Sequence, residues 1–183
     1  MNKFTFIQIA APSRSSIENY MKFEAEVRKT AEKINARFST EGYEPICLKI
    51  EHHSADQVLE YYRGSDLCFV SSLHDGMNLV AKEFVAAKED NKGVLILSQF
   101  AGASRELPEA LIVNPYDIVQ CADALNSALE MSENEQRDRM ISMRNLIKEF
   151  NVYRWAGRML IDAAQNRRNN RFKVRVEQQD KDA

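Results

Sequence analysis

The chain has 183 residues, of which 44% are hydrophobic and 28% are charged. This length and composition are those of one soluble globular domain with a sizeable apolar core. Its 25 basic and 27 acidic residues give a net charge of -2. That balance argues against a protein that coats nucleic acid or binds membranes through a basic surface. No apolar run approaches the roughly 20 residues that a membrane-spanning helix needs.

The chain carries no sign of export or of a metal centre. Its first residues, MNKFTFIQIAAPSR, lack a basic segment followed by a long apolar run, so we expect no secretion signal. The three cysteines lie in apolar surroundings without CxxC or Cys/His spacing. This pattern is typical of buried, reduced thiols and predicts no metal site. We therefore expect a cytoplasmic protein.

Strand-like and helix-like segments alternate from the start of the chain. Residues 4–9 form a run rich in β-formers, and residues 17–38 place apolar side chains three or four apart, which predicts an amphipathic helix. A second strand is expected at 46–50. A Ser-x-x-Gln capping box then opens a short helix over 54–63.

The middle of the chain continues this alternation. The apolar run at 67–70 predicts a third strand, and a helix at 78–88 follows a glycine-containing turn. Two more apolar strands are expected at 94–97 and 111–113. Buried apolar strands separated by helices are the signature of a parallel sheet with helices on both faces. The sequence therefore predicts an α/β fold.

The last third is expected to be helical. Capping boxes beginning at Asp117 and Ser132 predict helices of roughly 13 and 16 residues, and another is expected at 152–164. After residue 164 the sequence becomes polar and mixed in charge. We interpret 165–183 as a frayed helix end and a flexible tail. The folded domain is therefore expected to occupy 1–164.

Three loops with unusual polar content follow expected strands, at 10–14, 71–77 and 98–104. In an open parallel sheet, ligands bind beyond the carboxyl ends of the strands. The second loop is the most informative, because the turn Asp75-Gly76-Met77-Asn78 leads directly into a helix. The first backbone N–H groups of a helix have no partner within it, and the helix dipole places positive charge there.

These features predict a nucleotide-sugar site. The backbone amides of Leu79 and Val80 are placed to bind a phosphate or pyrophosphate. Asp75 precedes that point and is in reach of a hydroxyl-rich group. Glu83 is placed to accept hydrogen bonds from vicinal hydroxyls, such as those of a ribose. The alternative is an ordinary Asp-Gly turn followed by an asparagine cap.

Three segments in this region resemble a known family. HDGMNLVAKEFVAA, GVLILSQFAGAS and ALIVNPYD are similar to motifs in the C-terminal half of the trehalose-6-phosphate synthases, the family 20 retaining glucosyltransferases. The likeness includes QIAAPSR and the triplet Tyr153-Arg154-Trp155, and it extends over about residues 4–164. It implies a two-domain GT-B fold of which this chain supplies the C-terminal, Rossmann-like domain, at 1–164, which binds the nucleotide-sugar donor.

The resemblance implies transfer of glucose from UDP-glucose to glucose 6-phosphate, giving trehalose 6-phosphate and UDP, without a metal cofactor. The N-terminal domain is absent from this chain. So is the Arg/Lys pair that the family uses to clamp the diphosphate. Since catalysis depends on stabilising the leaving diphosphate and positioning the acceptor, no complete catalytic set is present. We therefore expect the isolated chain to be inactive.

The resemblance also implies roles for individual residues. It assigns the donor sugar to the turn, the diphosphate to the start of the helix, and the ribose to an acid farther along it. In that order the residues are Asp75, Gly76, Met77 and Asn78 for the sugar, Leu79 and Val80 for the diphosphate, and Glu83 for the ribose.

Two more assignments concern the first part of the chain. His52 and His53 fall where the nucleobase pocket is formed, largely by backbone groups. Arg14 matches the arginine that binds the phosphate of the sugar-phosphate acceptor, and a guanidinium suits bidentate phosphate binding. The alternatives are ordinary loop positions for the histidines and a solvent-facing position for Arg14.

One substitution and two alternatives stay open at this point. The resemblance places His74 where the family usually has arginine, so the local positive field is expected to be weaker, because histidine is shorter and is not permanently charged as arginine is. A glucosylglycerol-phosphate synthase would share the same donor motifs and differ in its acceptor residues. A non-catalytic module that binds a nucleotide-sugar and regulates is the competing class of function.

Overall fold

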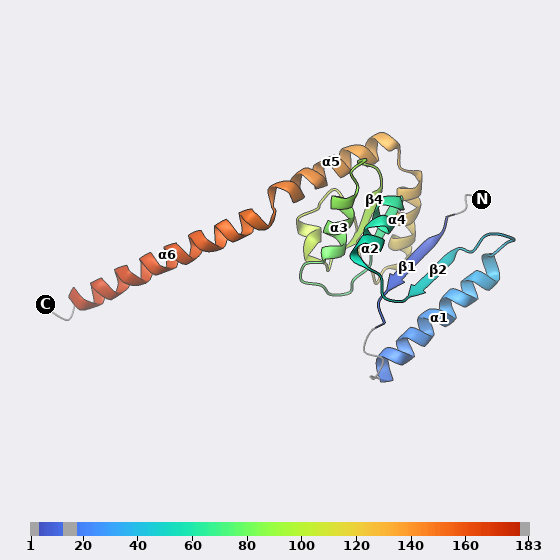
Figure 1. Cartoon of the computed structure of the whole chain (residues 1–183), viewed down its shortest axis with the longest axis horizontal. Helices are drawn as coiled ribbons and strands as arrows, with labels where there is room; N and C mark the ends of the chain where they lie inside the picture. The colour runs from blue at the N-terminus through green and yellow to red at the C-terminus, as the bar shows by residue number, and fades with distance from the viewer. Residues whose placement is uncertain (1–3, 13–17, 180–183) are drawn as a thin grey trace. The chain divides into compact units, whose positions relative to one another are not determined.

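The computed structural model describes residues 4–12 and 18–179 (Figure 1). The chain divides into two compact units, Met1–Val58 and Leu59–Ala183. Every strand pair in the described ranges is parallel. Within those same ranges, no helix combines the length and the apolar character needed to cross a membrane.

The first unit contains a two-stranded parallel sheet and one long helix. β1 (Phe6–Ala10) pairs with β2 (Ile46–Ile50), and α1 (Glu18–Phe38) connects them. Asn35 joins the helix to the sheet, because its side-chain amide donates to the carbonyl oxygen of Ile46 at 2.8 Å and accepts from the N–H of Ile46 at 3.0 Å. This bidentate contact satisfies both backbone groups at the start of β2.

The second unit contains a three-stranded parallel sheet. The strands are β3 (Leu67–Val70), β4 (Val94–Ser98) and β5 (Leu111–Val113), with β4 in the centre. All five residues of β4 are buried. The predicted strands therefore form two separate sheets, one of two strands and one of three.

Helices cover both faces of the three-stranded sheet. α3 (Leu79–Ala87) and α5 (Glu133–Glu149) pack on one face, and α4 (Ile118–Glu130) on the other. Alternate residues of β4 point to opposite faces, so Leu95 belongs to the cluster with α3 and Ile96 to the cluster with α4. The predicted α/β arrangement is confirmed in this unit.

Helix α2 (Ala55–Gly64) begins with the predicted capping box. The backbone N–H of Ser54 donates to Oε1 of Gln57 at 2.8 Å, and the N–H of Gln57 donates to Oγ of Ser54 at 3.3 Å. Asp117 and Ser132 accept from the backbone N–H three residues on, at 3.0 and 3.3 Å. The side chains at those later positions bond elsewhere, so α4 and α5 have simple N-caps instead of reciprocal boxes.

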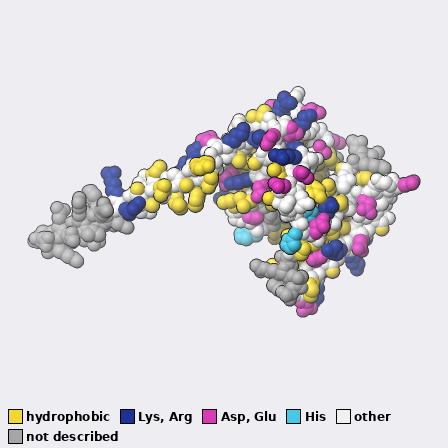
Figure 2. All heavy atoms as spheres, in the orientation of Figure 1, with side chains coloured by type: hydrophobic (Ala, Val, Ile, Leu, Met, Phe, Trp, Pro, Cys, Tyr) yellow, Lys and Arg dark blue, Asp and Glu magenta, His cyan; other side chains and the backbone are white. Residues whose placement is uncertain are grey.

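The last helix is longer than predicted. α6 runs over Val152–Gln179, whereas the sequence pattern predicted an end at residue 164; the flexibility of residues 165–183 stays a prediction. The greater length has a local reason: residues 165–179 contain no proline or glycine and are rich in Arg and Gln, which favour helix. Figure 2 shows hydrophobic side chains along the first part of α6, where Val152, Trp155 and Leu160 are exposed.

Candidate functional site

Two of the predicted loops meet beyond β3 and β4. The N–H of Asp75 donates to the carbonyl oxygen of Phe100 at 3.2 Å, and the N–H of Gly102 donates to the carbonyl oxygen of Asp75 at 2.9 Å. A third bond runs from the N–H of Ala103 to the carbonyl oxygen of Met77 at 2.7 Å. The short 3-10 helix η1 (Gly102–Arg105) therefore supports the turn that carries Asp75.

This contact requires a glycine at position 102. A Cβ atom there would lie 2.1 Å from the carbonyl oxygen of Gly76, much closer than two non-bonded heavy atoms can approach. Gly102 thus lets the backbones of the two loops touch. Gly76 is different, because a Cβ atom built on it would meet no heavy atom within 4 Å.

Asn78 organises the turn and caps the following helix. It has φ 72° and ψ 91°, a left-handed conformation that asparagine tolerates better than most residues. Its Oδ1 accepts from the N–H of Ala81 at 2.9 Å. Its Nδ2 donates to Oδ2 of Asp75 at 3.0 Å and to Oγ of Ser72 at 3.2 Å. One nearly buried side chain, 7% exposed, therefore fixes both the helix start and the carboxylate.

Asp75 is held as a carboxylate. The backbone N–H of Met77 donates to its Oδ1 at 3.0 Å. This hydrogen bond and the one from the Asn78 side chain lower the pKa of Asp75 from its ordinary value of 3.8, and the charge of His74 acts in the same direction. Asp75 is therefore ionised and oriented throughout the neutral pH range.

Only some of the backbone amides at the start of α3 have a hydrogen-bond acceptor among the described residues. Asn78 accepts the hydrogen bond of the Ala81 amide, and Asp75 accepts that of Met77. Among the residues that the structure describes, none accepts a hydrogen bond from the amide of Leu79 or Val80. These residues are 59% and 43% exposed. They are the two residues whose amides the sequence predicts to bind a diphosphate.

Glu83 lies on the exposed side of α3 and contacts a residue that the sequence analysis missed. The hydroxyl of Tyr62, on α2, donates to Oε2 of Glu83 at 3.4 Å. Burial, followed by the charge of Glu83, raises the pKa of Tyr62 to about 12. Asp75 and Glu83 thus have different partners in the described structure.

The remaining predicted residues belong to the first unit. His52 is exposed, whereas the side chain of His53 is 6% exposed. The ring of His53 contacts Glu51: Nδ1 lies 3.0 Å from the carbonyl oxygen of Glu51, and Nε2 lies 3.6 Å from the Glu51 carboxylate. Arg14 lies outside the described residues.

No three His, Cys, Asp or Glu side chains come together as a metal site needs within residues 4–12 and 18–179. The second unit can bind a ligand by hydrogen bonding. The amides of Leu79 and Val80, which have no acceptor among the described residues, can donate to an anion, and the carboxylates of Asp75 and Glu83 can accept from hydroxyl groups.

The family model described as Glycosyltransferase family 20 matches residues 1–165. The chain belongs to glycosyltransferase family 20. The trehalose-6-phosphate synthase of Klebsiella pneumoniae is 42% identical over 161 residues, which are 87% of this chain and 34% of that protein. The UDP-forming α,α-trehalose-phosphate synthase of Pichia angusta is 37% identical over 155 residues, covering 85% of this chain and 33% of that protein.

Solved structures of family members have the same fold. A UDP-forming α,α-trehalose-phosphate synthase from Burkholderia xenovorans, in complex with glucose-6-phosphate, matches with a TM-score of 0.83 and 38% identity. The E. coli protein solved with UDP-2-fluoro glucose matches with a TM-score of 0.83 and 40% identity. Each match covers 86% of this chain and 35% of the other. The predicted fold, the Rossmann-like C-terminal half of a GT-B glycosyltransferase, is thereby confirmed. The chain spans about a third of the length of the relatives it matches.

Replacing Gly102 by alanine tests the contact between the two loops. Because the new Cβ atom would lie 2.1 Å from the carbonyl oxygen of Gly76, we expect Gly102→Ala to lower the free energy of unfolding by about 2–4 kcal/mol. Gly157→Ala is the control: it adds the same atom in open space on α6 and should leave stability unchanged or raise it. Urea denaturation measures both. Equal stability of Gly102→Ala and the parent chain would contradict the close approach.

Replacing Asn78 by alanine tests its double role. Asn78→Ala removes the cap of α3 and should lower the free energy of unfolding by about 2–3 kcal/mol, because alanine also tolerates a positive φ poorly. Ser132→Ala, which removes the cap of α5, is the control and should cost about 1 kcal/mol. Chemical denaturation of both variants gives the comparison.

The same variant should change the titration of Asp75. Losing the Asn78 donor raises the pKa of Asp75 toward 3.8, whereas Ser132→Ala leaves it unchanged. Ionised Asp75 stabilises the fold above its unfolded pKa, and this stabilisation is lost as the pH falls through the lower folded pKa. In Asn78→Ala that acid-dependent loss becomes smaller. An NMR titration of the carboxyl group that finds the same pKa in both variants would refute the assignment.

Proposed function

We propose that this chain is the donor-binding domain of a cytoplasmic UDP-forming α,α-trehalose-phosphate synthase. The complete enzyme would transfer glucose from UDP-glucose to glucose 6-phosphate, releasing trehalose 6-phosphate and UDP. Membership of glycosyltransferase family 20 and similarity to proteins named for this activity support the proposal. So does the likeness to structures solved with UDP-2-fluoro glucose and with glucose-6-phosphate.

The observation that carries the proposal is the start of α3. The amides of two exposed residues, Leu79 and Val80, have no hydrogen-bond partner among the described residues, and they follow closely on a carboxylate, that of Asp75, which Asn78 holds in place. Such amides favour a diphosphate, and most strongly when it gains charge as a leaving group. Asp75 would accept hydroxyl groups of the donor sugar, together with backbone groups of Gly76, Met77 and Asn78. The Met77 amide would then exchange its bond to Asp75 for one to the sugar or share it between them.

The remaining site residues would bind the other parts of the donor and the acceptor. Glu83 would accept the ribose hydroxyls, and backbone groups near His52 and His53 would contact the base. Arg14 would bind the phosphate of the acceptor. The reaction would retain the configuration of the glucose without a protein nucleophile or a metal, because main-chain amides and basic residues of the complete enzyme would stabilise the leaving UDP.

Calorimetric titration of the 183-residue chain with UDP, ADP and GDP tests donor binding. We expect UDP to bind, and Glu83→Ala to weaken it about tenfold, since the variant loses charge-assisted hydrogen bonds to the ribose. Glu130→Ala, which changes an exposed acid at the end of α4, is the matched control and should bind UDP like the parent. Failure of all three nucleotides to bind would contradict the proposal.

Activity measurements separate the proposal from its alternatives. The isolated chain, incubated with UDP-glucose and glucose 6-phosphate, should release no UDP above background, because the second half of the cleft is not in it. Detectable transfer would refute this expectation. The complete polypeptide should use glucose 6-phosphate as acceptor. Use of glycerol 3-phosphate instead would identify a glucosylglycerol-phosphate synthase, and binding without any transfer would identify a regulatory module.

A further inference from the structure

Tyr62 makes two contacts that link α2 to α3. Its hydroxyl donates to Oε2 of Glu83 at 3.4 Å. Its ring packs edge-on against Phe84, with 6.3 Å between the ring centroids and an angle of 78° between the planes. Phe84 is fully buried in the core. The ring of Tyr62 therefore packs on a buried neighbour while its hydroxyl reaches the carboxylate of Glu83, the residue before Phe84 in α3.

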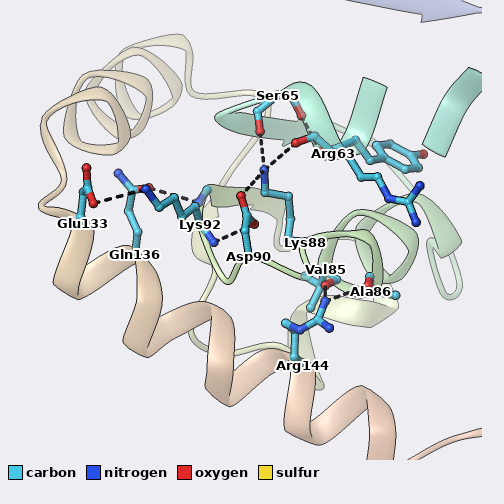
Figure 3. A network of polar contacts seen from close by, with 12 residues as sticks. Arg63, Ser65, Val85, Ala86, Lys88, Asp90, Lys92, Glu133, Gln136 and Arg144 are labelled. Atoms are coloured by element: carbon cyan, nitrogen blue, oxygen red, sulfur yellow. Dashed lines mark hydrogen bonds and ion pairs between the residues drawn. The ribbon is translucent and has the colours of Figure 1, made fainter. Parts of the chain in front are cut away.

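A buried lysine fixes the end of the helix that carries Tyr62. The ammonium group of Lys88 donates to the carbonyl oxygens of Arg63 and Ser65, at 3.0 Å each (Figure 3). Lys88 is the C-cap residue of α3, and its side chain is 4% exposed. It therefore joins the last turn of α2 to the end of α3 and satisfies carbonyl groups that have no partner within the helix.

We propose that Tyr62 is a positioning residue: it holds the carboxylate of Glu83 in the orientation that binds the ribose of the donor nucleotide. This inference rests on the proposed function of Glu83. An exposed glutamate must give up side-chain conformational freedom when a ligand fixes it, and that loss weakens binding. The bond from Tyr62 restricts the carboxylate beforehand and occupies Oε2, which leaves Oε1 to accept a ribose hydroxyl.

The tyrosine is suited to this role because it stays a donor. Its raised pKa, about 12, keeps the hydroxyl protonated across the pH range in which a cytoplasmic enzyme works. A phenylalanine at the same position would keep the packing against Phe84 and lose only the hydrogen bond. Tyr62→Phe therefore isolates the positioning effect from the packing effect.

The test compares a ligand that contains ribose with one that lacks it. For the 183-residue chain we expect Tyr62→Phe to weaken UDP binding about fivefold, which is the loss expected for one ordinary hydrogen bond and suits the 3.4 Å length of this one. Binding of inorganic pyrophosphate should not change, because it needs only the start of α3. Tyr153→Phe, which removes a hydroxyl from an exposed tyrosine on α6, is the control and should alter neither affinity. Equal weakening of UDP and pyrophosphate would overturn the inference, since it would indicate a general structural role.

A double-mutant cycle gives a second and independent result. In the Glu83→Ala background, Tyr62→Phe should have no further effect on UDP binding, because the carboxylate that it positions is gone. A further fivefold loss in that background would overturn the inference. If UDP binds and Glu83→Ala weakens it while Tyr62→Phe does not, the positioning role fails and the proposed function stands. If UDP does not bind the parent chain, the proposed function fails and this inference fails with it.

Discussion

The candidate site depends on the side chain of Asn78. Its amide caps α3 through the N–H of Ala81 and holds the carboxylate of Asp75 at the same time. Both effects come from one residue in a left-handed backbone conformation, so the direction of the helix start and the orientation of the acid are set together. This coupling leaves the amides of Leu79 and Val80 as the part of the helix start that has no hydrogen-bond acceptor among the described residues.

The sheet and its loops supply the rigid support for this arrangement. β4 is buried along its whole length and delivers the loop that contains Gly102 to the turn of Asp75. Because Gly102 has no side chain, the two loops come close enough for direct backbone hydrogen bonds. The turn that carries Asp75 is thus held to the neighbouring loop by main-chain hydrogen bonds, which leave the side chains of the candidate site free of that contact.

Much of this fold could be predicted from the sequence, because its signals are local. The strands at Ile46–Ile50, Leu67–Val70 and Leu111–Val113 coincide with their apolar runs. The Asp-Gly turn before Asn78 correctly indicated a helix start. The predicted end of α6 at residue 164 was wrong because the change to a polar sequence does not stop a helix, and residues 165–179 contain no proline or glycine.

The contacts that the sequence did not predict are between residues far apart along the chain. Tyr62 and Glu83 are 21 positions apart, and only the packing of α2 beside α3 brings them together. The amphipathic pattern of α2 shows that Tyr62 can lie on an inward face, but it does not show which residue its hydroxyl meets. The incomplete capping boxes of α4 and α5 have a different, local cause, since partners six and four positions away take the side chains that would have closed them.

The most direct measurement is an NMR titration of the backbone amides of the ¹⁵N-labelled chain with UDP. If the backbone amides of Leu79 and Val80 donate hydrogen bonds to the phosphates of UDP, their signals should shift most, and the shifts should saturate with the binding curve. The signal of Ala81, already bonded to Asn78, should move less. UDP binding that leaves Leu79 and Val80 unperturbed would contradict the account.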